Sequence, residues 1–474
     1  MQLTLEWRRF ASAYRFDLQR VVRWLRWACV CWVVVFWRLG WLSLLDPDEA
    51  HYAELTREMM QARSWFVPLL DGSPYIDKPV LFHWLQVLAV RLFGDTEFAL
   101  RMPSACAAVA LFAVTRWVGA ALFDEEVGEW GALMFATIPA TFALGSIGVF
   151  DMVFCAFLFG GVGTLLVSAM RARRRLQYVG FTLVALAVLT KGPVALVLVG
   201  LFVGLVVRCA DRSRRLILAL DWKRGVGVVL LLSVPWFAWM YQMFGAQFVS
   251  GYLLAGNLWY FTQPLQFSSR TVSHTFYVRT FLGGFFPWSL VTIGRGIDAT
   301  RAWRNRHVLP TADAFLWAWV VVVVGFFSVA RFKLDTYILP AAPACCLLAA
   351  RGWRVALNDS RMFATRVSLL LMGVALVGIG AVAAVELFRI DLGLSVGAAV
   401  LPAALVVGGT VLVGQTIKGQ FNPPHSLLAP LVTLLVAYAA TVMVGFPALE
   451  RTRPVAFAAR FLRSHSSDAA PVGL

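Results

Sequence analysis

Carboxylates gather in one short stretch of the chain, "LLDPDEAHYAELTR" at 44–57. Only 14% of the 474 residues are charged, yet five acids fall between positions 46 and 58: Asp46, Asp48, Glu49, Glu54 and Glu58. A carboxylate held beside reacting atoms can act as a general base or orient a substrate, which makes Asp48 and Glu49 candidate catalytic residues. The stretch "DEAHYAELTREMMQ" is predicted to form a short helix, because apolar residues recur in it at helical spacing and early carboxylates suit a helix N-terminus. The alternative to a catalytic role is that these acids cap this helix and solvate a loop.

Basic residues that could bind an anion occur in two motifs. In "YIDKPV", 75–80, Asp77 and Lys78 precede a proline, and this lysine could hold a lipid phosphate while its stem lies along apolar surface. In "RFKLDTY", 331–337, Arg331 and Lys333 are two positions apart and could hold a second anionic group. The alternatives are a snorkelling lysine in the first motif and an interfacial anchor in the second.

Two further ionisable residues lie beside apolar segments. Asp151 in "SIGVFDMVF" is a lone acid among apolar neighbours, and such a group requires a cation or a substrate as a partner. Lys191 in "LTKGPV" precedes a Gly-Pro turn and either lines the same pocket or serves only as an interfacial residue. These groups predict a pocket of acids and cations near the lipid headgroups.

The elements that must position these residues are membrane helices, because 60% of the chain is hydrophobic and its mean hydropathy is +0.73. A soluble globular protein cannot bury that much apolar surface. The net charge of +16 collects in loops and so indicates sidedness in a membrane rather than a nucleic-acid partner. The seven cysteines show neither metal-site nor disulfide spacing, and we expect them to serve in packing.

Five basic clusters are expected in the cytoplasm, and an even number of crossings must separate each pair. They are the arginines up to Arg26, "RARRR" at 171–175, 208–224, 295–306 and 351–366. The segment 79–93 would span only about 22 Å as a helix, so we expect it to be a juxtamembrane or re-entrant helix that starts and ends outside. Thirteen spans then remain, near 24–45, 98–122, 129–147, 150–170, 176–190, 194–208, 226–243, 277–294, 313–330, 336–351, 367–386, 393–414 and 427–446.

This count predicts an all-α polytopic membrane protein with a cytoplasmic N-terminus and an outer C-terminus. Residues 1–446 would form one transmembrane domain, in which 46–97 is a large acidic outer loop and a second outer loop runs from Phe244 to Phe276. Residues 447–474 would form a short outer tail.

Three classes of function fit these features. The first is an enzyme acting on lipid-linked substrates. The second is a transporter or lipid flippase, although alternating access favours a site near the bilayer midplane, whereas these charged residues collect at one face. The third is a receptor or scaffold whose acidic loop binds a partner.

The stretch "DPDEAHYAELTREMMQARSWFVPLLDGSPYIDKPVLFHWL" resembles the first outer-loop signature of the bacterial protein-mannosyltransferase and aminoarabinose-transferase family, which is glycosyltransferase family 39/83-like. Further similarity comes, in the family's order, from "ALRMPSA", "FDMVF", "LTKGPVALVL", "VPWFAWM", "FFPW" and "RFKLDTYILPAAPA". The resemblance implies a GT-C fold in the bacterial inner membrane, with the active site on the periplasmic face. It also implies inverting transfer of a sugar from a polyprenyl phosphate, such as undecaprenyl phosphate, to an acceptor outside.

The resemblance also implies roles for single residues. Lys78 would hold the lipid phosphate, with Arg331 and Lys333 lining the same cavity. Asp48 would act as a general base or would orient the sugar or acceptor, and Asp151 would match the family's second acid. Beside them, Glu49 stays a catalytic candidate, and the substrate pocket would contain His51, Tyr52, Asp77, Lys191 and Tyr337.

Four positions depart from the family's pattern. His51 stands where the family usually has Arg, Asp77 replaces a Glu, and Val80 replaces a Pro. Gly256 in "LLAGNLWYF" stands where the family often has a His that could bind metal, so a divalent metal is left open. The acceptor also stays open among lipid A, another glycolipid, a polysaccharide and a protein.

Overall fold

The computed structural model describes residues 21–451, other than 38, 46, 210, 263–272, 274, 306, 357–362, 390–395 and 419–422. Regular structure in this part of the chain is helical apart from one two-stranded hairpin, in which β1 (Leu69–Leu70) pairs antiparallel with β2 (Ser73–Pro74). The predicted all-α class is confirmed.

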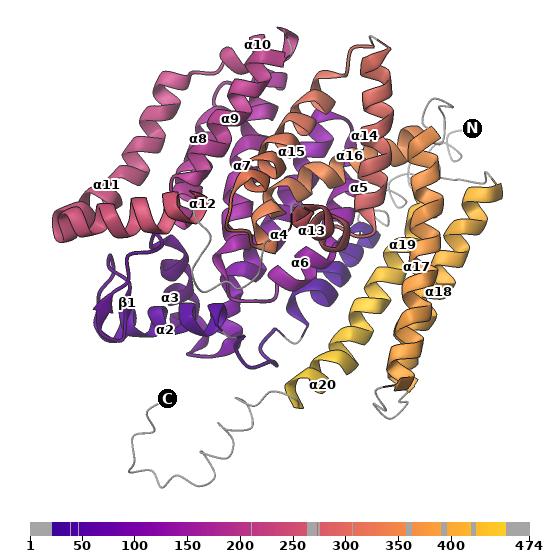
Figure 1. Cartoon of the computed structure of the whole chain (residues 1–474), viewed down its shortest axis with the longest axis horizontal. Coiled ribbons are helices and arrows are strands. Elements are labelled where there is room, and N and C mark those ends of the chain that lie inside the picture. Colours follow the sequence, from indigo (N-terminus) through magenta and orange to yellow (C-terminus); the bar gives the residue numbers. More distant parts are fainter. Residues whose placement is uncertain are drawn as a thin grey trace, which may run out of the picture.

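Most of the helices run between two ends of the molecule (Figure 1). Seven of the described helical segments are long and apolar enough to cross a membrane: α4 (Glu97–Leu122), α7 (Phe150–Arg171), α11 (Trp222–Phe248) with η2 (Val249–Trp259), α15 (Thr311–Val329), α17 (Phe363–Arg389), α18 (Val396–Lys418), and α19 (Pro423–Ala440) with η4 (Thr441–Gly445). Three shorter helices are also apolar: α3 (Leu81–Phe93), α8 (Leu176–Lys191) and α9 (Val194–Cys209). The chain is therefore a multi-pass membrane protein, while the count of thirteen crossings stays a prediction.

The span expected at 24–45 is helical only as far as Phe36, where η1 (Trp32–Phe36) ends. Two more of the predicted spans are wrong as single helices, because a proline interrupts each of them. The span expected at 129–147 is divided into α5 (Glu125–Ala136) and α6 (Pro139–Leu144), and the one at 277–294 into α13 (Phe276–Gly284) and α14 (Trp288–Arg304). Pro139 and Pro287 lack the amide hydrogen that would continue the preceding helix, and each disfavours helical geometry in the residue before it. The outer loop expected from Phe244 is also wrong at its start, because η2 and α12 (Tyr260–Thr262) continue the helical path.

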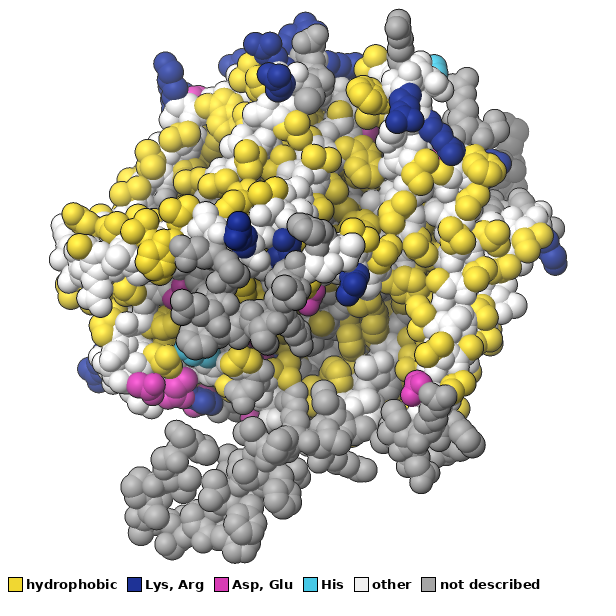
Figure 2. Space-filling view, viewed as in Figure 1, with side chains coloured by type: hydrophobic (Ala, Val, Ile, Leu, Met, Phe, Trp, Pro, Cys, Tyr) yellow, Lys and Arg dark blue, Asp and Glu magenta, His cyan; other side chains and the backbone are white. Residues whose placement is uncertain are grey.

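The two ends of the molecule differ in charge. Figure 2 shows Lys and Arg side chains along the end that carries α10 (Asp211–Leu218), whereas Asp and Glu side chains cluster at the opposite end, where α2 (Asp48–Gln61) and α3 lie. The predicted separation of basic and acidic loops is therefore present in the folded chain.

Helix α2 has the bounds expected of the stretch "DEAHYAELTREMMQ". Its buried face includes Tyr52, Leu55 and Met59, which recur at helical spacing and pack the helix onto its neighbours. Its N-cap is Pro47 and no side chain caps it, so capping does not explain Asp48.

Two later parts of the chain contact the segments that carry the candidate site: η3 (Asp335–Ala341) packs on α7, and α20 (Phe446–Arg451) contacts the segment before α2. The 3-10 segment η3 leads into α16 (Ala342–Ala356). Helix α20 extends beyond the boundary predicted at 446, and Ser43 donates hydrogen bonds to Glu450 from its amide at 3.3 Å and its hydroxyl at 3.1 Å. The rest of the predicted tail, 452–474, lies outside the described residues.

Candidate functional site

The fold brings the predicted acids Asp48 and Asp151 into electrostatic reach of each other, although 103 positions separate them. Asp48 lies exposed in the first turn of α2, and Asp151 lies in the first turn of α7 with 9% of its surface exposed. Partial desolvation raises the pKa of Asp48, and the negative charge of Asp151 raises it further. A carboxylate with a raised pKa is a stronger base, as proton abstraction requires.

Lys191 is the cation that partners Asp151. Its Nζ lies 2.7 Å from Oδ1 of Asp151, and the two side chains are only 10% and 11% exposed. Three rings surround the ammonium, with centroids 5.0 Å (Phe150), 5.3 Å (Phe154) and 4.6 Å (Tyr337) from Nζ. Within the described structure Oδ2 of Asp151 accepts no hydrogen bond, so it is available to a ligand.

Aromatic rings join α2 to α7 beside the two acids. The ring of His51 lies 4.9 Å from that of Tyr75 and 5.8 Å from that of Tyr52. Tyr52 in turn lies 5.2 Å from Phe150, the neighbour of Asp151 in sequence. Burial raises the pKa of Tyr52, and Asp151 raises it next, so this hydroxyl remains protonated and can donate a hydrogen bond.

The predicted phosphate ligand Lys78 lies between β2 and α3. Its Nζ contacts Asp77 Oδ2 at 2.7 Å, and the hydroxyl of Tyr75 donates to the same oxygen at 3.3 Å. The charges of Lys78 and Lys191 are close enough to interact, which places Lys78 in the same cluster as the two acids. Asp77 therefore holds the ammonium of Lys78 in place.

Arg331 and Lys333 occupy the segment between α15 and η3. The amide of Arg331 donates to the carbonyl of Phe261 at 3.0 Å, and Nζ of Lys333 donates to the carbonyl of Ala330 at 2.7 Å. Neither side chain has a carboxylate partner in the part of the chain that is described, and neither contacts the acids directly. Tyr337, from the same segment, does join the cluster through Lys191.

The structure adds Arg279, which our sequence analysis missed. It lies exposed on α13, beside the segment of Arg331, because the hydroxyl of Thr280 donates to Asp335 at 2.7 Å and ties α13 to η3. Among the described residues Arg279 has no acidic partner. The signal was available, since an arginine inside the apolar stretch "FYVRTF" is uncommon in a membrane protein.

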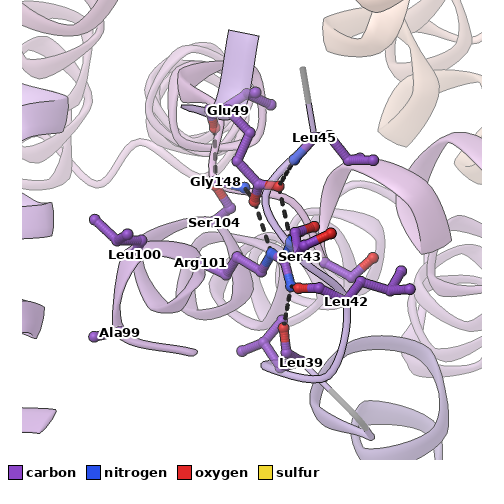
Figure 3. A network of polar contacts seen from close by, with 12 residues as sticks. Leu39, Leu42, Ser43, Leu45, Glu49, Ala99, Leu100, Arg101, Ser104 and Gly148 are labelled. Carbon is purple, nitrogen blue, oxygen red and sulfur yellow. Dashed lines mark hydrogen bonds and ion pairs between the residues drawn. The ribbon is translucent and has the colours of Figure 1, made fainter. Parts of the chain in front are cut away.

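Glu49 does not face the pocket. It is 2% exposed, and its two oxygens form a bidentate ion pair with Arg101 of α4, with Nε–Oε1 at 2.7 Å and Nη2–Oε2 at 2.8 Å (Figure 3). The amides of Gly148 and Leu45 donate to the same carboxylate at 2.6 and 2.8 Å. Because each oxygen already accepts two hydrogen bonds, we revise the predicted role of Glu49 from a catalytic residue to a positioning residue.

The possible metal site predicted from the family's pattern does not fit the residues present. A Cβ on Gly256 would lie 2.7 Å from Oδ1 of Asp77, so this position does adjoin Asp77, but the glycine supplies no ligand. Among the described residues, no three His, Cys, Asp or Glu side chains lie close enough together to hold a metal ion.

Comparison with known proteins supports the resemblance seen in the sequence. A family model described as dolichyl-phosphate-mannose-protein mannosyltransferase matches residues 77–239. The chain is 31% identical over 327 residues to undecaprenyl phosphate-alpha-4-amino-4-deoxy-L-arabinose arabinosyl transferase 1 of Sodalis glossinidius, over 65% of this chain and 55% of that protein. It is 29% identical over 365 residues to the arabinosyl transferase of Aeromonas salmonicida, over 73% of this chain and 63% of that one. The chain thus spans between 55% and 63% of the length of these relatives.

Solved structures agree on the fold. The crystal structure of ArnT from Cupriavidus metallidurans bound to undecaprenyl phosphate matches with a TM-score of 0.67 and 24% identity, covering 90% of this chain and 78% of that one. Its apo form matches with a TM-score of 0.68. The predicted GT-C fold is confirmed, as is the resemblance to the protein-mannosyltransferase and aminoarabinose-transferase-like family.

Proposed function

We propose that this chain, a GT-C fold protein of the mannosyltransferase and aminoarabinose-transferase-like type, transfers a sugar from a polyprenyl phosphate to an acceptor. The observation that carries the proposal is the ion pair of Asp151 and Lys191 at 2.7 Å, whose charges interact with those of Asp48 and Lys78, although the four residues come from separate segments of the chain. Cations stabilise a phosphate leaving group, and a carboxylate with a raised pKa can receive a proton. Both requirements of glycosyl transfer are met within one cluster.

In the proposed reaction, an acceptor oxygen attacks the anomeric carbon of the sugar while the bond from that carbon to the phosphate oxygen breaks, which inverts the anomeric centre. Lys78, oriented by Asp77, stabilises the negative charge that develops on the departing phosphate. Asp48 accepts the proton of a hydroxyl acceptor, and Asp151 orients the sugar or acceptor through its open Oδ2. If the acceptor is itself a phosphate, no proton is removed, no strong base is needed, and Asp48 only orients the sugar.

The remaining predicted residues line the proposed pocket. His51, Tyr52 and Tyr337 present ring surfaces to the sugar, while Arg331, Lys333 and the newly found Arg279 hold a second anionic group. The names of the relatives support undecaprenyl phosphate carrying an aminopentose as the donor. The more specific form of the proposal has lipid A as the acceptor. In its general form the acceptor is lipid A, another glycolipid, a polysaccharide or a protein.

We propose that the site faces the periplasm of a bacterial inner membrane, with the N-terminus in the cytoplasm. The proposal is supported by the accumulation of Lys and Arg at the end that carries α10 and of acids at the end that carries α2 (Figure 2). Residues 1–446 would form the transferase domain, with the tail beyond them on the periplasmic side.

The test is reconstitution of the purified chain in liposomes with radiolabelled undecaprenyl-phosphate aminoarabinose and a whole-envelope lipid extract. Transfer by the wild type and its loss in Asp48→Asn and Lys78→Ala are expected, since each change removes one charge from the cluster. Glu54→Gln, on the exposed side of α2, and Lys223→Ala, exposed on α11, are matched controls that should keep transfer.

The labelled product would identify the acceptor class. Movement of the intact lipid-linked sugar across the vesicle membrane, without transfer to any acceptor, would instead show that the chain is a flippase.

A further inference from the structure

We infer that Arg101 is a positioning residue that sets Asp48 and Asp151 in register for the transfer reaction, an inference that rests on the proposed function. Arg101 is 2% exposed on α4, and Glu49, its partner, directly follows Asp48. No direct contact joins Arg101 to either candidate acid, so its effect must pass through the backbone segments it holds.

The first of these segments is the link that leads from η1 (Trp32–Phe36) into α2. Nη1 of Arg101 donates to the carbonyls of Leu39 and Leu42, both at 2.8 Å, and Nη2 donates to the carbonyl of Ser43 at 3.1 Å (Figure 3). The Leu45 amide then binds Oε2 of Glu49 at 2.8 Å. These contacts fix where α2 begins, and Asp48 is its first residue.

The second segment is the turn that leads into α7. The amide of Gly148 donates to Oε1 of Glu49 at 2.6 Å, and the hydroxyl of Ser104 on α4 donates to the carbonyl of Val149 at 2.8 Å. A Cβ on Gly148 would lie 3.0 Å from the carbonyl oxygen of Leu100 and 3.2 Å from Oε1 of Glu49, which shows how closely this turn is held. Asp151 lies three residues further on. One guanidinium–carboxylate pair therefore fixes the starts of both acid-bearing helices against α4.

Arginine is required for this arrangement because its planar fork supplies all five hydrogen bonds in fixed directions. A lysine keeps the charge but cannot reach the carbonyls and both carboxylate oxygens together. Since a displacement of about 1 Å at reacting groups can cost about 100-fold in rate, we expect Arg101→Lys to lower the single-turnover transfer rate by about that factor. Donor affinity should stay nearly unchanged, because Lys78 does not contact the Glu49–Arg101 pair.

The experiment compares Arg101→Lys, Glu49→Gln and the milder Ser104→Ala with a matched control, Asp313→Asn. Asp313 is also fully buried and pairs with Arg295 at 2.7 Å, but it lies at the start of α15, at the opposite end of the molecule from α2 (Figure 1). Each variant is measured in nanodiscs for transfer rate, for equilibrium binding of the labelled donor, and for amide hydrogen exchange. Ser104→Ala keeps the comparison informative if Arg101→Lys does not fold.

The inference predicts a lower transfer rate, unchanged donor binding and faster exchange in residues 39–49 and 145–151 for the three α4 and α2 variants. Asp313→Asn should lower stability while leaving the transfer rate and these amides unchanged. Arg101→Lys with faster exchange but an unchanged rate would overturn the inference, as would an equal loss of rate in Asp313→Asn. If the wild type transfers no sugar, the proposed function fails, and unchanged exchange in both segments would separately overturn the positioning role.

Discussion

Replacing Lys191 with methionine tests the ion pair at the centre of the proposed site. Methionine is similar in length to the lysine stem and can fill the space between the rings of Phe150, Phe154 and Tyr337. The change therefore removes the ammonium with little loss of packing. Its main consequence is that Asp151 loses the cation 2.7 Å from its Oδ1.

The size of the effect follows from the burial of the pair. Removing one partner of a buried ion pair costs about 3–5 kcal/mol, because the other charge is left without compensation. The two side chains retain 10% and 11% exposure, so water can reach Asp151 in part, and we expect a loss near the lower end, about 3 kcal/mol. The transfer rate should fall as well, since Asp151 is no longer held in place.

The assay is thermal unfolding in nanodiscs, followed by tryptophan fluorescence, together with the transfer assay. Lys191→Met should lower the unfolding midpoint, whereas Lys223→Met, at an exposed site on α11, should not. The double variant Asp151→Asn/Lys191→Met removes the uncompensated charge, so it should recover most of the stability but none of the activity. A Lys191→Met protein as stable and as active as the wild type would refute this reasoning, and so would a double variant less stable than Lys191→Met.

Three further outcomes are expected. Burial lowers the pKa of His83 to about 3, whereas its pKa in the unfolded chain is near 6.5. The neutral buried imidazole therefore contributes its full stability above pH 6.5, and this contribution is lost as the pH falls toward 3. The unfolding midpoint of the wild type should fall more steeply over this range than that of His83→Gln. Gly192→Ala should cost about 1–3 kcal/mol, because φ is +94° and the new Cβ would clash with Oη of Tyr252. Adding Tyr252→Phe should restore only the part caused by the clash, as thermal unfolding of the single and double variants would show. Arg279→Ala should raise the KM for an anionic substrate with little change in kcat, and an unchanged KM in steady-state transfer would remove Arg279 from the proposed site.

Much of the architecture follows from local features of the sequence. Helix α2 could be predicted with its bounds because apolar residues at helical spacing and early carboxylates are signals contained within one segment. Most of the apolar spans also match helices of the structure, since hydropathy acts over the length of a single helix. The breaks at Pro139 and Pro287 were missed because a run of apolar residues hides a single proline, although the lost amide hydrogen is a local property too.

The sequence by itself determined that this is a membrane protein, where most of its apolar helices lie, and which ionisable residues require partners, because burying an uncompensated charge is costly wherever it lies. Only the tertiary structure decided which residues partner these ionisable groups. Glu49 and Asp48 are adjacent and chemically alike, yet Glu49 pairs with Arg101, 52 positions away, while Asp48 stays exposed within reach of the charge of Asp151. Adjacent residues on a helix point in directions about 100° apart, so the packing of α2 against α4 and α7 determines which carboxylate is buried and which faces the pocket.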